Sequence, residues 1–247
     1  MFQNTTPQKP QNEFEAIILA GGRGLRLSPL TDSCPKPLLK IRGKQILEYI
    51  VSEIRLSGVS DVTIATRYLK DQISGCFADR YQCVEANFET MIDSFIYVAS
   101  KSIKDYLLCL SADTLITKNS MIHTIERHLE TESDITITLS RTNKSKKRWR
   151  YITDENGFLQ ELNIGAPNNN LERSGLVMNR QIIDSLKDYI SQNPNYGQFD
   201  SGWNLIFKMM LDQDKKIYVS KQNFPVFNIN TKDDLEEAKS FVLENLT

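Results

Sequence analysis

The stretch "FEAIILAGGRGLRLSPLTDSCPKPLL", residues 14–39, passes from an apolar run directly into a glycine-rich, basic loop. Branched aliphatic side chains dominate 14–20, which predicts a buried β-strand that ends at Gly21. Glycines let backbone N–H groups approach anionic oxygens closely, and arginines add charge-assisted hydrogen bonds to phosphate. A strand followed by such a loop indicates a phosphate-binding site at the end of the strand.

The loop matches neither of two common phosphate-binding patterns. No Gly-Lys-Ser/Thr follows, so it is not a Walker A motif, and Leu27 stands where GxGxxG requires its third glycine. Lys36 lies between Pro35 and Pro37, whose rigid rings hold its stem in place. We expect the loop to bind a nucleoside triphosphate; the alternative is a strand-to-loop turn with exposed basic residues.

Further along the chain, helical and strand patterns alternate. Apolar stripes predict helices over 44–58 and 90–102 and around Met121–Leu129, and apolar runs predict strands over 61–67, 106–113 and 134–140. This alternation predicts an α/β fold with a Rossmann-like, mostly parallel central sheet flanked by helices.

The alternation loosens after residue 141. A hairpin is expected over 150–163, turning at 155–157, and it defines a smaller antiparallel lobe. A short strand at 175–179, helices around 180–191 and 200–212, strands at 216–220 and 224–230, and a capped helix from Thr231 follow. We expect a disordered tail over 1–13 and a single domain over 14–247.

Composition excludes several classes of protein. The net charge of −1 argues against nucleic-acid binding, and no apolar stretch is long enough to span a membrane. The four cysteines lack metal or disulfide spacing, which indicates free thiols and a cytoplasmic location. His123 and His128 lie far from any acidic or cysteine cluster, so we expect surface roles for both. The sequence is compatible with a homo-oligomer.

Residues 19–39 resemble the signature LAGGxGTRLxPLTxxxPKPLL of the nucleotidyltransferases that activate sugar phosphates, with Leu25 in place of threonine. Segments 44–73, 107–116 and 227–238 resemble later motifs of the same family. The resemblance implies that a nucleoside monophosphate passes from a triphosphate to a phosphorylated sugar or alcohol, with release of pyrophosphate. The expected product is a nucleotide sugar for surface glycan synthesis.

The resemblance also implies roles for individual residues. Arg26 would contact the β- and γ-phosphates, Lys36 the α-phosphate, and Asp113 a catalytic Mg²⁺. Asp113 ends an apolar strand, where open α/β sheets place their ligands. Asn228 would be the second metal ligand, with Asn230 as the near alternative. The nucleotide-binding set is expected to comprise Leu19, Ala20, Gly21, Gly22, Arg23 and Gly24.

Two family features are missing, and they leave the acceptor open. "ETMIDSF", 89–95, stands where a GTGGA-like segment is usual, and Glu161 is followed by Leu162 rather than lysine. Glu161 and Asp200 are candidates for acceptor binding, and the basic run 143–150 is either a source of phosphate-binding charge or a solvated loop. The alternatives are a cytidylyltransferase acting on phosphocholine or inositol phosphate, a non-catalytic nucleotide-binding homologue, and a glycosyltransferase.

Overall fold

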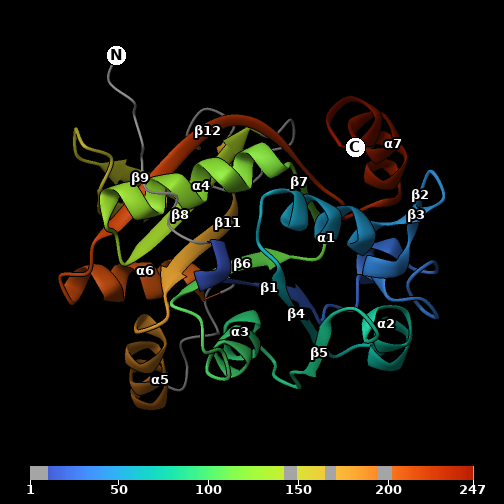
Figure 1. Ribbon diagram of the computed structural model, residues 1–247, viewed down its shortest axis with the longest axis horizontal. Helices are drawn as coiled ribbons and strands as arrows, with labels where there is room; N and C mark the ends of the chain where they lie inside the picture. The colour runs from blue at the N-terminus through green and yellow to red at the C-terminus, as the bar shows by residue number, and fades with distance from the viewer. Residues whose placement is uncertain (1–10, 142–148, 165–170, 194–201, 247) are drawn as a thin grey trace.

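The computed structural model describes residues 11–141, 149–164, 171–193 and 202–246. Its centre is an eight-stranded sheet with the order β5-β4-β1-β6-β11-β8-β12-β7 (Figure 1). The expected Rossmann-like α/β architecture is therefore confirmed.

The strands in the first half of the sheet are all parallel. The order in which the chain adds them reverses at β1. From β1 (Phe14–Ala20) the chain passes outward through β4 (Asp61–Thr66) to β5 (Gln82–Glu85), both parallel to their neighbours. It then returns to place β6 (Tyr106–Ser111) parallel to β1 on the other side. Two strands whose connections leave in opposite directions form a crevice at their carboxyl ends, which is where doubly wound sheets bind ligands.

The second half of the sheet is mixed. The strand β11 (Leu171–Asn179) runs antiparallel to both β6 and β8 (Ile135–Arg141), and is longer than the predicted 175–179. The two strands expected at 216–220 and 224–230 are one strand, β12 (Ile217–Asn228). Its pairing with β8 shifts register between Gln222 and Pro225, because proline has no N–H to donate to the ladder. At the edge, β7 (Thr114–Ile116) pairs antiparallel with β12.

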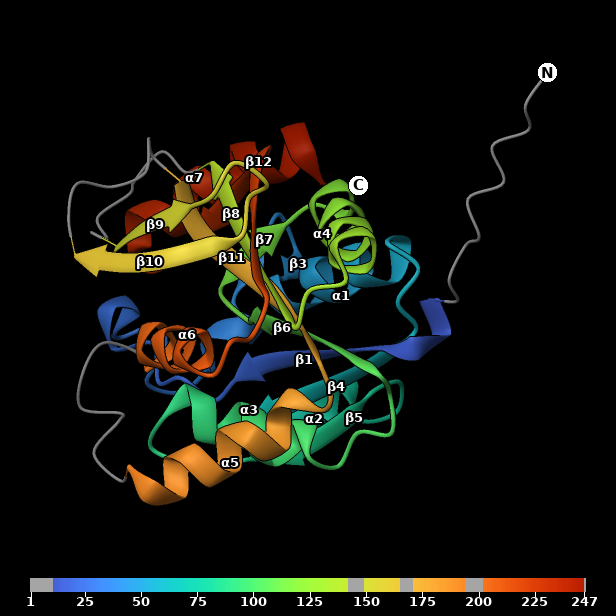
Figure 2. The same ribbon diagram turned by 90° about the vertical axis from the view of Figure 1, so that its left-hand side faces the viewer.

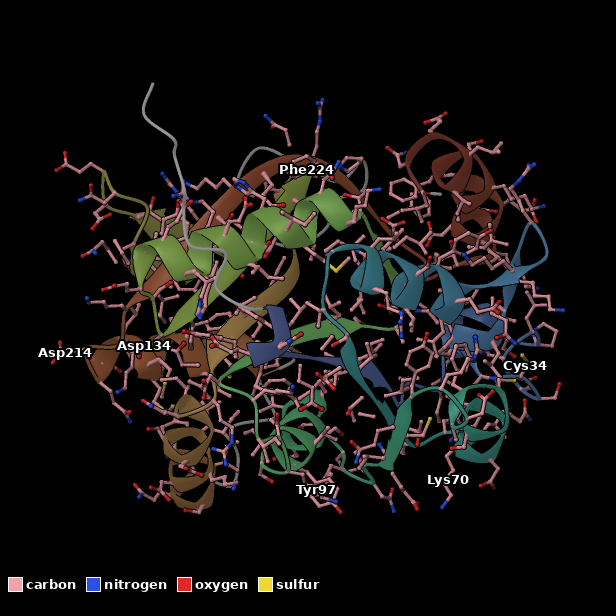
Figure 3. All side chains as sticks on the ribbon, viewed as in Figure 1. Cys34, Lys70, Tyr97, Asp134, Asp214 and Phe224 are labelled. Atoms are coloured by element: carbon pink, nitrogen blue, oxygen red, sulfur yellow. The ribbon has the colours of Figure 1, made fainter. Side chains whose placement is uncertain are left out.

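Helices cover both faces of the sheet, so each face lies over its own apolar core (Figure 1). One core takes buried residues from α1 (Ile46–Leu56), α2 (Lys70–Phe77), α4 (Lys118–Thr131) and α7 (Lys232–Asn245). The other takes them from α3 (Met91–Ala99), α5 (Ile182–Gln192) and α6 (Trp203–Asp212). In Figure 3, Tyr97 lies below α3 and Phe224 lies beyond α4, on opposite sides of the molecule in this view. Among the described residues, no helix is long and apolar enough to cross a membrane.

Two small antiparallel sheets flank the main one. The predicted hairpin is confirmed as β9 (Trp149–Thr153) and β10 (Leu159–Ile164), with Gly157 at a φ of +91° in its turn. This hairpin and α6 lie on the side of the molecule toward which β1 points (Figure 2). The second pair, β2 (Lys40–Ile41) and β3 (Lys44–Gln45), leads into α1.

Some local predictions differ from the structure. Residues 11–13, assigned to the tail, form a 3-10 turn, and the Asn12 carbonyl accepts a hydrogen bond from Lys104 Nζ over 2.7 Å. The surface role expected for His128 is wrong, because the side chain is 1% exposed and bonds to Thr136 and Asn179. His128 follows buried Ile125 by three positions, so it shares that face of α4. All four cysteines are free.

Candidate active site

The loop after β1 is braced by a set of backbone contacts. Gly24 has a φ of +64°, a left-handed conformation that favours glycine. Its carbonyl accepts hydrogen bonds from the Leu27 N–H and the Thr31 hydroxyl, over 2.8 and 2.9 Å. The Tyr68 hydroxyl donates to the carbonyls of Thr31 and Asp32. These hydrogen bonds fix the conformation of the loop at Gly24 and again at Thr31 and Asp32. Positive φ is observed at Gly24 but not at Gly21 or Gly22.

Lys36 starts a 3-10 helix, Lys36–Leu38, between two prolines. The residue is 8% exposed, so the apolar stem is buried and the ammonium group is directed at oxygens. Lys36 Nζ donates to Asp113 Oδ2 over 2.7 Å and to Asn230 Oδ1 over 3.3 Å. One ammonium group thus joins the loop after β1 to the ends of β6 and β12.

Asp113 lies in the turn between β6 and β7, at the carboxyl edge of the sheet. Its Oδ1 accepts hydrogen bonds from the hydroxyls of Ser111 and Thr114, over 2.6 and 3.3 Å. Burial raises the pKa of the carboxyl group, but the charge of Lys36 and the hydrogen bonds outweigh burial, and the pKa lies below its usual value. The carboxylate is therefore ionised at neutral pH.

Asn230, rather than Asn228, joins this group. Its Oδ1 accepts a hydrogen bond of 2.7 Å from Arg26 Nη2 in addition to the bond from Lys36. Its backbone N–H donates to Asp234 Oδ2, within the capping box that starts α7. Asn228 instead accepts a 2.6 Å bond from the Thr114 hydroxyl, in the β12–β7 pair, and is not among the cavity-lining residues described next.

A cavity of about 570 Å³ opens over the carboxyl ends of β1 and β6. All six residues of the predicted nucleotide-binding set line it: Leu19, Ala20, Gly21, Gly22, Arg23 and Gly24. Arg26, Lys36, Asp113 and Asn230 line it as well. Residues predicted from distant parts of the sequence therefore meet at one site, at the crevice where the strand connections change direction.

The other end of the cavity was missed by the sequence analysis. It is lined by the residues that follow β4 and β5 and by the start of α3: Ala65, Arg67, Ala86, Phe88, Glu89, Thr90, Met91 and Ser94. Arg67 Nη2 donates to Glu89 Oε1 over 2.7 Å. Arg67 was identifiable in principle, because it follows a strand parallel to β1. The segment after β5 was not, since four residues of mixed polarity give no clear strand pattern.

Glu161, one of the two acceptor candidates, is not brought to this cavity. Glu161 lies exposed on β10, where its Oε1 accepts a hydrogen bond from Asn163, and it does not line the cavity. Leu162, where the lysine was expected, is buried in the apolar core. Asp200 lies outside the described residues, as does most of the basic run 143–150.

The donor set suits a magnesium ion. Asp113 Oδ2 and Asn230 Oδ1 both accept hydrogen bonds from Lys36 Nζ, so these two oxygens lie close together. Magnesium prefers hard oxygen ligands, keeps several waters and takes further oxygens from substrate phosphates. One carboxylate and one amide oxygen beside a phosphate-binding loop fit that preference. Among the described residues, no group of three or more His, Cys, Asp and Glu side chains forms a metal cluster.

Comparison with known proteins identifies the family. Residues 15–153, more than half of the chain, match the family model described as Nucleotidyl transferase. The chain belongs to the nucleotidyl transferase family. The matched residues include the glycine-rich loop, Lys36 and Asp113.

Curated relatives differ in base and acceptor. The chain is 27% identical over 167 residues to D-glycero-alpha-D-manno-heptose 1-phosphate guanylyltransferase of Aneurinibacillus thermoaerophilus, covering 62% of this chain and 72% of that protein. It is 26% identical over 187 residues to mannose-1-phosphate guanylyltransferase of Mycobacterium tuberculosis, covering 71% of this chain and 51% of the relative. The match therefore spans only about half the length of the second relative.

Cytidylyltransferases are also among the similar proteins. A segment of 59 residues is 41% identical to choline-phosphate cytidylyltransferase of Streptococcus pneumoniae, covering 24% of this chain and 26% of the relative. A solved structure of CTP:phosphocholine cytidylyltransferase from Streptococcus pneumoniae superposes with a TM-score of 0.72 at 20% identity, over 93% of this chain and 99% of that chain. At that identity the superposition establishes the shared fold alone.

Proposed function

We propose that the protein transfers a nucleoside monophosphate from a nucleoside triphosphate to a sugar 1-phosphate of the hexose or heptose type. An oxygen of the acceptor phosphate attacks the α-phosphorus, a new P–O bond forms, and the bond to the β-phosphate breaks to release pyrophosphate. The observation that carries the proposal is the convergence of Arg26, Lys36, Asp113 and Asn230 in the cavity beside the glycine-rich loop.

Such a displacement needs positioning and neutralisation of charge more than covalent chemistry. In this proposal the loop N–H groups orient the triphosphate, and Lys36 stabilises the charge that develops on the α-phosphate. Arg26 lies at the exposed mouth of the same cavity and binds the leaving pyrophosphate. Because Lys36 is buried and fixed by two prolines, little reorganisation accompanies the reaction.

We propose Mg²⁺ as the cofactor, held by Asp113 and Asn230. When bound, this ion neutralises negative charge on the triphosphate. Asp113 supports the assignment because it is ionised at neutral pH and accessible from the cavity. In this proposal the enzyme acts in the cytoplasm. Its product is an activated nucleotide sugar that serves as a precursor for surface glycans.

A second candidate is cytidylyl transfer to a non-sugar phosphate such as phosphocholine. It is favoured by the 41% identity of the short cytidylyltransferase match and by the buried Leu162 where sugar-phosphate enzymes resembling this chain carry lysine. A homologue that binds nucleotide without catalysis is the third candidate, and it has no need of the Lys36–Asp113 arrangement.

Pyrophosphate release separates these candidates. The purified protein is incubated with Mg²⁺, each common nucleoside triphosphate and a panel of acceptors: glucose, mannose, heptose and amino-sugar 1-phosphates, phosphocholine and inositol phosphate. Release that depends on a sugar 1-phosphate supports the first candidate, and release with phosphocholine or inositol phosphate supports the second. Triphosphate binding without release from any pair supports the third.

A further inference from the structure

The ammonium group of Lys36 contacts the same two oxygens that are proposed to hold the metal ion. Nζ donates to Asp113 Oδ2 over 2.7 Å and to Asn230 Oδ1 over 3.3 Å. The lysine stem is buried and lies between two prolines, so it directs the ammonium group at these oxygens from a fixed base. Lys36 and a bound metal ion therefore compete for the same oxygens.

Other donors occupy the remaining acceptor positions of these side chains. Asp113 Oδ1 accepts hydrogen bonds from the hydroxyls of Ser111 and Thr114. Asn230 Oδ1 accepts a second bond, of 2.7 Å, from Arg26 Nη2. An amide oxygen has two lone pairs, so cationic donors fill both acceptor positions of Asn230 Oδ1. At least one of these donors must release that oxygen before it can ligate a metal ion.

The charge of the cavity also opposes the entry of a free divalent cation. Among the described residues that line it, positive side chains outnumber negative ones: Arg23, Arg26, Lys36 and Arg67 against Glu89 and Asp113. Glu89 is paired with Arg67 at the other end of the cavity, so its charge is already balanced. Positive charges in a partly desolvated site repel a further cation. Binding of a metal ion is therefore unfavourable until a ligand brings negative charge.

A triphosphate changes both the charge and the hydrogen bonds. Its phosphate oxygens are negative and form charge-assisted hydrogen bonds with lysine and arginine. Rotation about the terminal bonds of Lys36 takes Nζ to a phosphate oxygen in the cavity, while the buried stem stays in place. Asp113, whose side chain is 32% exposed, then presents Oδ2 to the cavity. This movement belongs to substrate binding and precedes the chemical step.

We propose that the Lys36 ammonium group blocks the metal ligands until a triphosphate draws it away, so that Mg²⁺ binds with the triphosphate rather than before it. The proposal rests on the proposed function, because it takes Asp113 and Asn230 as the metal ligands. The two positions of Lys36 Nζ form the element on which both ligands act, so each ligand promotes binding of the other. Without substrate, the same contact pairs the charge of Asp113.

Binding of Mn²⁺ to the protein without nucleotide tests the proposal and requires no activity. Mn²⁺ binds the same kinds of oxygen ligand as Mg²⁺, and electron paramagnetic resonance measures the free ion. Lys36→Met keeps the apolar stem and removes the charge, so it should bind Mn²⁺ at least about ten-fold more tightly than wild type. Combining Lys36→Met with Asp113→Asn should abolish this gain. Lys40→Met is the matched control, because Lys40 is exposed on β2, and it should match wild type.

Equal Mn²⁺ affinity in wild type and Lys36→Met, or no binding by either, overturns the proposal. A gain that survives Asp113→Asn, or that Lys40→Met shares, overturns it too, because the ion then binds elsewhere or responds to net charge alone. If circular dichroism shows that Lys36→Met does not fold, Lys36→Gln decides, since it also removes the charge and must also gain affinity. If wild type releases no pyrophosphate with any pair, the proposed function fails, and the Mn²⁺ comparison still decides whether Lys36 blocks a metal site.

Discussion

Lys36 Nζ lies 2.7 Å from Asp113 Oδ2, a contact that joins two residues 77 positions apart in the sequence. The loop after β1 and the turn after β6 each contribute one member, so the pair spans the crevice of the doubly wound sheet. In the proposed reaction, the cation that contacts the α-phosphate and the carboxylate that binds the metal ion are therefore already positioned. Such preorganisation avoids ordering these groups during the reaction.

Asn230→Ala should raise the Mg²⁺ concentration for half-maximal activity by at least about ten-fold, because it removes an oxygen that faces Asp113. Asn228→Ala is the matched control, since Asn228 bonds to Thr114 beside the β12–β7 pair. It should change the Mg²⁺ requirement less than about two-fold and lower stability by about 1 kcal/mol. Mg²⁺ titrations of pyrophosphate release give both values. Equal effects of the two substitutions would refute the assignment to Asn230.

Gly24→Ala should lower the free energy of unfolding by about 1–2 kcal/mol, because its φ of +64° is unfavourable for a residue with a Cβ. That Cβ would also lie 3.1 Å from Thr31 Cγ2 and 3.3 Å from Lys36 Cβ, so triphosphate affinity should fall as Lys36 shifts. Gly22→Ala meets nothing within 4 Å and should change stability by less than about 0.5 kcal/mol. Urea denaturation and calorimetric titration measure the two effects, and equal losses in both variants would argue against this account of the loop.

His128 should make the protein less stable in mild acid. Burial lowers its pKa from the ordinary 6.5 to about 4, so between these values the unfolded chain binds more protons than the folded one. Stability from the neutral imidazole is complete above pH 6.5 and is lost as the pH falls toward 4, by up to about 3 kcal/mol.

Urea denaturation at pH 7.5 and pH 4.5 tests this dependence. The decrease in stability should be clearly smaller in His128→Gln than in wild type, because glutamine does not titrate. His123→Gln should retain the wild-type decrease, since His123 is only partly buried. If His128→Gln loses as much stability in acid as wild type, the assigned cause is wrong.

The sequence predicted the parts of this fold that have strong local patterns. The run 14–20 and the helix over 44–58 carry unbroken apolar patterns, and the structure confirms both elements. The short β5 and β7 lack such patterns, since tertiary pairing rather than local preference makes them strands. The direction of the strands in the second half of the sheet could not be predicted from local sequence patterns either. The insertion of β11 between β6 and β8 depends on contacts between residues distant in the sequence.

The candidate site was predictable where residues follow a strand or lie in a distinctive loop, as with Lys36 and Asp113. The choice between Asn228 and Asn230 was not, because the two are separated by one residue and both are asparagine. The structure separates the two by position: Asn228 is the last residue of β12, whereas Asn230, which precedes the cap of α7, lines the cavity.

The most direct test of the central claim is pyrophosphate release by wild type, Lys36→Ala, Asp113→Ala and Lys40→Ala across the panel of triphosphates and acceptors. Lys40 is the control because it is exposed on β2, just beyond the loop. We predict release from one triphosphate and one acceptor, reduced at least about 100-fold in Lys36→Ala and Asp113→Ala and unchanged in Lys40→Ala. Release that survives in both site variants, or a wild-type protein that binds no triphosphate, would contradict the account.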